Sequence, residues 1–256
     1  PLLRNINGIE PHTIFFKNYD TNVFNLPTDR EEELFVKIIT ELNPKFVGFS
    51  VLSPYVPIAR RLTKLVKDNS SSLVIWGGVH PTIFPEDCIN EIDMLCIGEG
   101  EGAITDLAKH LLDGKSYQSI KNLWVKNGDH IIKNPMRPLI QDLDSIPFPS
   151  YGDSSYYFID SNKITKDDSL LSDNYFWVQT SRGCPYSCSY CVNSLLRPLF
   201  KDLGPYTRRR SVGNIIREIK ENLSLPRNMT DYVFFIDEVF GNEEPWLNEF
   251  ESQYKK

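Results

Sequence analysis

The sequence lacks an apolar run long enough to cross a membrane, and it lacks a sustained block of basic residues. No stretch approaches the ~18 apolar residues that a membrane-spanning helix requires. The formal net charge is -6 at pH 7, which argues against a nucleic-acid interface based on counterion release. The first residues, PLLRNINGIEPHT, also lack a signal-peptide profile. We therefore expect a soluble protein that binds neither nucleic acid nor membrane.

Cysteine is scarce, and its distribution argues against two common uses. Five cysteines are an odd number for a disulfide framework, and a chain of 256 residues can bury enough core to fold without disulfides. A structural zinc site takes four ligands, commonly as two close pairs. Cys88 and Cys96 lie far upstream of the other three in apolar surroundings, and we expect both to be small buried hydrophobic residues. Free cysteines also favour a reducing cytoplasm.

The other three cysteines are spaced Cys184-x-x-x-Cys188-x-x-Cys191 within the run TSRGCPYSCSYC. Three thiolates this close together can hold three corners of an iron–sulfur cluster, and a [4Fe–4S] cluster normally takes four thiolates. A triplet without a nearby fourth cysteine therefore predicts one iron that is open to a non-protein ligand. Zinc or unrelated thiols are the alternatives that the spacing leaves.

The first half of the chain alternates between strand and helix patterns, which predicts a parallel sheet covered by helices. A β-hairpin is expected at residues 122–132, with Asn127-Gly128 at its turn. The expected strands are residues 13–16, 46–51, 72–78 and 93–98, and the expected helices are residues 29–42, 57–67 and 101–112.

The second half begins with a segment that has no sustained periodicity. Residues 133–173 are rich in Pro, Asp, Ser and Tyr, which predicts a linker or a wrapping segment. Residues 174–256 then return to a strand–helix pattern. The expected strands there are residues 175–180 and 231–237, and the expected helices are residues 212–223 and a helix that begins near Pro245.

Three expected strands of the first half end in unusual loops. Ligands of open parallel sheets bind outside the carboxyl ends of the strands, and glycines let the backbone approach a bulky ligand. Carboxylates there can accept hydrogen bonds or cap the next helix. Each loop alone is equally well explained as a tight strand-to-helix turn. The candidate residues are Ser50, Ser53 and Tyr55 after the first of these strands, Gly77, Gly78, Val79 and His80 after the second, and Gly98, Glu99, Gly100 and Glu101 after the third.

Together and in order, these motifs resemble one branch of the radical S-adenosylmethionine superfamily, in which a cobalamin-binding domain precedes the barrel. The similar features are the serine-containing loop, GG-x-H-P-T, GEGE, the DLDSIPFPSY segment and the cysteine loop, so the resemblance covers nearly the whole chain. It implies a doubly wound, Rossmann-like α/β domain for cobalamin at residues 1–132. A linker at residues 133–173 and the beginning of a (β/α) partial barrel at residues 174–256 would follow. We expect this incomplete barrel to be inactive alone.

The resemblance also assigns roles to residues near the cysteines. Cys184, Cys188 and Cys191 would hold a [4Fe–4S] cluster, whose open iron is chelated by S-adenosylmethionine. Tyr190 matches an aromatic position whose backbone lies against the adenine. Asp237 and Glu238, at the end of the expected strand 231–237, match the position of acidic residues that face the methionine ammonium, and either carboxylate could pair with it.

His80 raises the question of an axial cobalt ligand, because imidazole binds cobalt. The Asp-x-His-x-x-Gly signature that supplies such a histidine in other cobalamin proteins is absent. We therefore expect base-off cobalamin without a histidine ligand, and a hydrogen bond from the His80 ring to a loop carbonyl. Cobalt ligation by His80 is the alternative.

The function implied by the resemblance is methyl transfer to an unactivated carbon through a 5′-deoxyadenosyl radical. The cofactors would be a [4Fe–4S] cluster, S-adenosylmethionine and cobalamin. The expected partners are a small-molecule or peptide substrate and an electron donor such as flavodoxin or ferredoxin. One alternative is a radical cyclase or oxidoreductase with the same cofactors, and another is a cofactor-binding fragment without catalysis.

Overall fold

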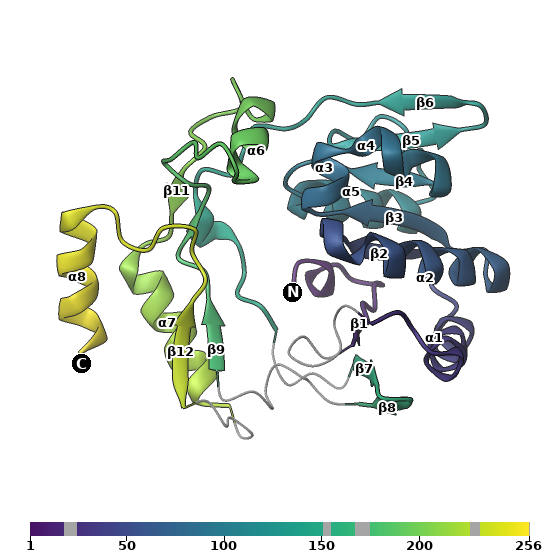
Figure 1. The fold of residues 1–256 in the computed structure, drawn as a ribbon, viewed down its shortest axis with the longest axis horizontal. Coiled ribbons are helices and arrows are strands. Elements are labelled where there is room, and N and C mark those ends of the chain that lie inside the picture. The colour runs from purple at the N-terminus through teal and green to yellow at the C-terminus, as the bar shows by residue number, and fades with distance from the viewer. Residues whose placement is uncertain (18–24, 151–154, 167–174, 226–230, 256) are drawn as a thin grey trace. The chain divides into compact units, whose positions relative to one another are not determined.

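The computed structural model describes residues 1–17, 25–150, 155–166, 175–225 and 231–255, which belong to two compact units (Figure 1). The N-terminal unit comprises residues 2–137 and 155–166. The C-terminal unit comprises Pro1 and residues 138–154 and 167–256. The segment 133–173, predicted as a linker, is thus divided between the two units. No helix within the described ranges is long and apolar enough to span a membrane.

The N-terminal unit contains a five-stranded sheet with the order β2-β3-β4-β5-β6 (Figure 1). The predicted parallel pairing holds for β2, β3 and β4, whereas β5 and β6 are antiparallel and form the predicted hairpin. The hairpin turn consists of residues 128–129, one position later than predicted, and Gly128 adopts a φ of 61° there. The strands are β2 (Phe46–Ser50), β3 (Leu73–Gly77), β4 (Met94–Cys96), β5 (Leu123–Asn127) and β6 (His130–Lys133).

Helices cover both faces of this sheet, as the α/β prediction required. Alternate residues of β3 face opposite sides: Trp76 joins a core with α1 (Asp29–Leu42) and α2 (Val56–Asn69). Ile75 joins a second core with α5 (Glu101–Leu112). The period of two along a strand therefore separates the two apolar clusters. α1 and α5 have the predicted bounds, and α2 is longer than predicted at both ends.

β1 (Thr13–Phe16) differs from the prediction because it lies outside the five-stranded sheet. It pairs in parallel with β7 (Tyr156–Asp160), which pairs in antiparallel with β8 (Lys163–Thr165). β7 and β8 come from the segment that was predicted to be a linker or a wrapping segment. Residues 155–166 thus belong to the N-terminal unit because they complete a small sheet with β1.

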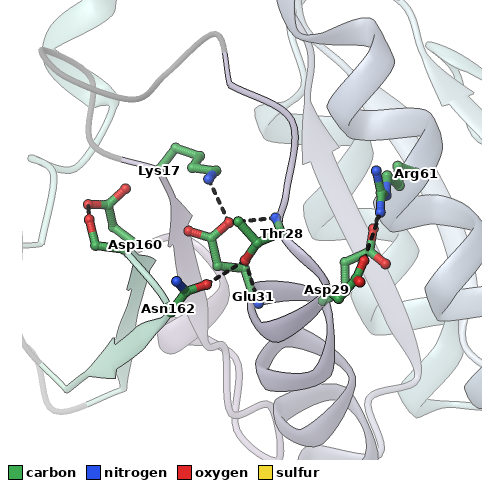
Figure 2. A network of polar contacts seen from close by, with 9 residues as sticks. Lys17, Thr28, Asp29, Glu31, Arg61, Asp160 and Asn162 are labelled. Carbon is green, nitrogen blue, oxygen red and sulfur yellow. Dashed lines mark hydrogen bonds and ion pairs between the residues drawn. The ribbon is translucent and has the colours of Figure 1, made fainter.

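A buried ion pair connects the end of β1 to the first turn of α1 (Figure 2). Lys17 Nζ lies 2.6 Å from Glu31 Oε2, and both residues are buried. Glu31 also accepts the Thr28 N–H at 2.9 Å and completes a capping box with Thr28. Burial alone would raise the pKa of Glu31, but Lys17 and the Thr28 N–H together lower it. This contact fixes the start of α1.

The C-terminal unit is built on a two-stranded parallel sheet of β9 (Tyr175–Val178) and β12 (Tyr232–Phe235). One face packs against α7 (Val212–Leu223) and α8 (Glu244–Tyr254) through Phe176, Val178 and their apolar neighbours. The opposite face carries exposed aromatic side chains, including Trp177 and Phe234. α7 has the predicted bounds, and α8 begins next to Pro245 as predicted.

Short elements complete the two units. In the C-terminal unit, β10 (Ser181–Arg182) and β11 (Arg208–Arg209) form an antiparallel ladder that brackets the cysteine loop. The remaining elements are η1 (Leu3–Asn5), η2 (Ser53–Tyr55), α3 (Val79–Ile83), α4 (Pro85–Cys88), η3 (Ile89–Glu91), η4 (Leu143–Ser145) and α6 (Asn193–Leu199).

Candidate functional site

The predicted loops after β2 and β3 are joined at the carboxyl edge of the sheet. Val51 donates its N–H to the Gly77 carbonyl at 2.8 Å, and His80 donates its N–H to the Val51 carbonyl at 3.1 Å. Ser53 Oγ lies 3.0 Å from Nδ1 of the His80 ring. The ring was expected to contact a loop carbonyl, but its partner is this hydroxyl, because η2 brings Ser53 to the start of α3.

Thr82, which was not among the residues predicted from the sequence, joins the loop after β4 to the same edge. Its buried hydroxyl donates to the Gly78 carbonyl at 2.8 Å and accepts the Gly98 N–H at 3.0 Å. The signal was present in the GG-x-H-P-T run, in which only the glycines, Val79 and His80 were selected. All three predicted loops therefore meet in one hydrogen-bonded arrangement.

Position 78 requires a glycine because two loops of the protein, those after β2 and β3, are in close contact there. Its φ is +100°, and a Cβ there would lie 2.9 Å from both the nitrogen and the carbonyl oxygen of Val51. A Cβ on Gly77 would make only an ordinary contact, 3.5 Å from the Cβ of Cys96. From the sequence, both glycines were predicted to allow close approach of the backbone to a ligand. The structure gives Gly78 a different reason, because its backbone abuts the loop after β2.

The other candidate residues lie at this edge with distinct exposures. Ser50 ends β2 and is exposed, and the last residue of η2, Tyr55, is half-buried. Val79 begins α3, and Glu99 is half-buried in the loop before α5. Gly100 is the N-cap of α5, which has no side-chain capping bond, and Glu101 is the first helical residue. A carboxylate there interacts favourably with the helix dipole.

The edge has the chemical character that a corrinoid needs. Leu52 and Phe84 are exposed there, at 45% and 44%, beside the hydrogen-bonding side chains of Ser53 and His80. The Phe84 ring centroid lies 5.4 Å from that of His80. A large cofactor with an apolar ring and amide substituents matches apolar surface mixed with polar groups. We conclude that the residues present fit cobalamin.

The environment of His80 predicts a pH dependence of stability. Burial lowers its pKa, Arg60 lowers it further, and Asp87 opposes them. A histidine with a folded-state pKa below the ordinary value of about 6.5 contributes stability above that value, and the contribution is lost as pH falls through the folded-state pKa. We expect His80→Gln to flatten the decline of unfolding free energy below about pH 6.5. Urea titrations over a pH series would measure it.

His130 provides the control for this measurement, because it lies exposed on the β5–β6 hairpin. A change of equal size in the pH dependence of the His130→Gln variant would show that the effect belongs to the loss of any histidine. An unchanged slope in His80→Gln would contradict the assignment of the pH dependence to His80.

The cysteine loop connects β10 to α6 in the C-terminal unit. Cys184 is buried, Cys188 is exposed and Cys191 is half-buried, and Cys191 donates its N–H to the Cys188 carbonyl at 3.0 Å. Among the residues that the structure describes, no three His, Cys, Asp or Glu side chains are grouped as a metal site. The donor set itself, three thiols on one short loop after a strand, fits three corners of a [4Fe–4S] cluster.

Asp237 and Glu238 differ sharply in their surroundings. The Asp237 carboxylate accepts the N–H of Thr180 at 3.0 Å and its hydroxyl at 2.9 Å, and it also accepts the Ser181 hydroxyl. Asp237 therefore ties the end of β12 to the start of β10. Glu238 is exposed, and its charge adds to the effect of burial in raising the pKa of Tyr206 beside the cysteine loop. Of the two acids, Glu238 has the carboxylate that is open to a ligand.

Tyr190 is the remaining residue that was predicted near the cysteines, and three consecutive arginines lie on and after β11. Tyr190 is 92% exposed, so its side chain is open to solvent. Arg208, Arg209 and Arg210 each hold a structural contact. Arg208 donates to the Ile140 carbonyl at 2.9 Å, Arg209 lies over the Trp246 ring, and Arg210 pairs with Glu218.

Comparison with known proteins finds relatives over most of the chain. A family model described as "B12 binding domain" matches residues 13–108, which include all three strand-end loops. The uncharacterized methyltransferase PH0819 of Pyrococcus horikoshii is 33% identical over 189 residues, which are 72% of this chain and 38% of that protein. An anaerobic magnesium-protoporphyrin IX monomethyl ester cyclase of Cereibacter sphaeroides is 28% identical over 60% of this chain and 25% of that protein.

A solved structure has the same fold over most of the chain. TsrM of Kitasatospora setae, a radical S-adenosylmethionine methyltransferase with cobalamin and a [4Fe–4S] cluster bound, matches with a TM-score of 0.68 at 16% identity. The match covers 89% of this chain and 44% of that chain. This chain therefore spans less than half the length of PH0819 and of TsrM. On the matched B12-binding domain, the relatives and the shared fold, it belongs to the radical S-adenosylmethionine enzymes that carry a cobalamin-binding domain.

Proposed function

We propose that the protein is a cobalamin-dependent radical S-adenosylmethionine methyltransferase that acts on an unactivated carbon. The observation that carries the proposal is the presence of two sites in one chain. Three strand-end loops are hydrogen-bonded together within the B12-binding match, and a three-cysteine loop follows β10 in the next unit. A relative named as a methyltransferase supports methyl transfer.

In this proposal each site has its own task. When bound, the cluster would supply the electron that cleaves S-adenosylmethionine, and cobalamin would carry the methyl group. Cys184, Cys188 and Cys191 would hold the cluster. Ser53, Gly78 and His80 lie at the edge that would hold cobalamin, with the hydroxyl of Ser53 orienting the His80 ring.

The methionine ammonium needs a carboxylate partner, and we propose Glu238. Asp237 is engaged by Thr180 and Ser181, whereas Glu238 is exposed near Tyr206. Glu238→Gln should weaken S-adenosylmethionine binding roughly ten- to a hundredfold, because a charge-assisted hydrogen bond contributes about 1.5–3 kcal/mol. Titration of S-adenosylmethionine against the cluster spectrum would measure the affinity.

Asp237→Asn provides the matched comparison at the neighbouring position. An amide offers one acceptor oxygen where the carboxylate offers two, so this variant should lower the free energy of unfolding by about 1–3 kcal/mol. Glu238→Gln should leave that free energy nearly unchanged. If Glu238→Gln binds S-adenosylmethionine as the wild type does, the ammonium is held by another group.

The reaction itself is tested by isotope transfer. Full-length protein, reconstituted anaerobically with iron, sulfide and cobalamin, would be incubated with S-adenosylmethionine labelled in its methyl group and with candidate small-molecule or peptide substrates. Reduced flavodoxin or ferredoxin, the electron donors that we propose together with a cytoplasmic location, would start the reaction. Label in the product supports methyl transfer.

A radical cyclase is the second candidate, and the similarity to the magnesium-protoporphyrin ester cyclase favours it. The two functions differ in the fate of the labelled methyl group. Release of 5′-deoxyadenosine together with an unlabelled, ring-closed product would support the cyclase and contradict the methyltransferase. If the reconstituted protein retains neither a corrinoid nor a cluster, both functions are contradicted.

A further inference from the structure

A chain of partly buried polar contacts links Cys191 to Tyr206 through Asn193, which was not among the residues predicted from the sequence. Asn193, the first residue of α6, is 4% exposed. Its amide nitrogen lies 3.7 Å from Sγ of Cys191, within reach of a hydrogen bond to sulfur. Its amide oxygen accepts the Tyr206 hydroxyl at 2.5 Å. Because the oxygen is engaged by Tyr206, the amide is held with its N–H groups toward the sulfur.

Tyr206 is itself fixed from three sides. Its ring stacks on Phe200, with centroids 5.9 Å apart, and the Arg197 guanidinium lies 5.4 Å from the ring centroid on which it packs. Burial raises the pKa of Tyr206 to about 12, and the charge of Glu238 contributes. The Tyr206 carbonyl also lies in close contact with Gly183, and a Cβ at position 183 would collide with this carbonyl. Tyr206 therefore cannot turn away from Asn193 without disturbing the loop.

Arg197 connects the same group of residues to the first cysteine. Its guanidinium donates to the Cys184 carbonyl while it packs on the Tyr206 ring. The β10–β11 ladder, which pairs Arg182 with Arg208, holds the strand ends on both sides of these contacts. One side-chain assembly thus touches the first and the last cysteine of the triplet.

We propose that Asn193 is a positioning residue that donates to the Cys191 sulfur and raises the reduction potential of the cluster held by the triplet, with Tyr206 fixing its amide. The inference rests on the proposed function, because it requires the cluster. Reduction adds negative charge to the cluster and its thiolates, so an N–H donor at sulfur stabilises the reduced form more than the oxidised form. Removing the donor should lower the potential.

The test is a redox titration of full-length, anaerobically reconstituted protein, followed by electron paramagnetic resonance of the reduced cluster. Asn193→Leu removes the donor. At a fixed solution potential, it should lower the ratio of reduced to oxidised cluster roughly three- to tenfold, as expected for one hydrogen bond. Tyr206→Phe leaves the amide in place but frees it to rotate, and should produce a smaller change in the same direction.

Asn214→Leu is the matched control. Asn214 is also 4% exposed, lies in the first turn of α7, and bonds to Arg210 rather than to the cysteine loop. The Asn214→Leu variant should have a lower free energy of unfolding and an unchanged reduction potential of the cluster. If the Asn193→Leu variant has its full iron content and an unchanged reduction potential of the cluster, the inference is wrong, but the proposed function is not affected. If the Asn193→Leu variant takes up no iron, the Tyr206→Phe variant is the test. An unchanged reduction potential of the cluster in Tyr206→Phe would then overturn the inference. A wild-type protein without a cluster would overturn both this inference and the proposed function.

Discussion

Simultaneous replacement of Cys184, Cys188 and Cys191 by alanine is expected to abolish cluster binding. The wild-type protein should take up about four irons and as much sulfide per chain on anaerobic reconstitution, because the triplet supplies three of the thiolates of a [4Fe–4S] cluster. The variant should retain only background iron. Iron and sulfide analysis, together with loss of the visible absorption of the cluster, would measure the effect.

Cys88→Ala and Cys96→Ala are the controls, because they also remove a cysteine each. Burial raises the pKa of Cys88 to about 11 and that of Cys96 to about 12. Their thiols therefore stay protonated near neutral pH, whereas the thiolate is the form that binds metal. Both control variants should keep the full iron content. Undiminished iron and sulfide in the triple variant would remove the cluster assignment.

Gly78→Ala is expected to produce the largest change in stability and in corrinoid uptake at the N-terminal site. The new Cβ would lie 2.9 Å from two backbone atoms of Val51, at a φ of +100° that side chains rarely adopt. Strain of this kind costs roughly 2 kcal/mol or more of the free energy of unfolding. Because Val51 and Gly78 join two of the three loops, the affinity for corrinoid should fall together with the free energy of unfolding. Urea unfolding and titration with cobalamin would measure the two effects.

Gly77→Ala separates the geometry of Gly78 from a general effect of adding a methyl group to the loop. Gly77 has no positive φ, and its added Cβ would meet the Cβ of Cys96 at an ordinary 3.5 Å. Its unfolding free energy should stay within about 1 kcal/mol of the wild type. Equal losses in both variants would show that the close approach to Val51 is not what makes Gly78 necessary.

The helices were predictable because their signals are local. The α1 helix has the predicted bounds, and its start is fixed by a capping box between Thr28 and Glu31, three residues apart. The period of its apolar residues extends over the same stretch. α5 and α7 were likewise predicted with their observed bounds. Such patterns act within a few residues, so they can be read without knowledge of distant neighbours.

The small sheet of β1, β7 and β8 was not predictable for the opposite reason. β7 begins 143 positions after β1, with Thr13 paired to Tyr156, and it lies in a segment whose Pro, Asp and Ser content indicated a linker. Strand propensity depends on a partner that completes the sheet and buries one face. The sequence of residues 155–166 does not identify that partner.

The sequence by itself determined which chemistry is present: the cysteine spacing, the glycine-containing strand ends and the two acids, all of which are readable because they are contiguous motifs. Only the tertiary structure decided how these groups are used. It joined Ser53 to His80, and Thr82 to Gly98, and it engaged Asp237 with Thr180 while leaving Glu238 exposed. The physical reason is that a hydrogen bond between residues 16 to 57 positions apart depends on sheet register and loop geometry, which no local pattern encodes.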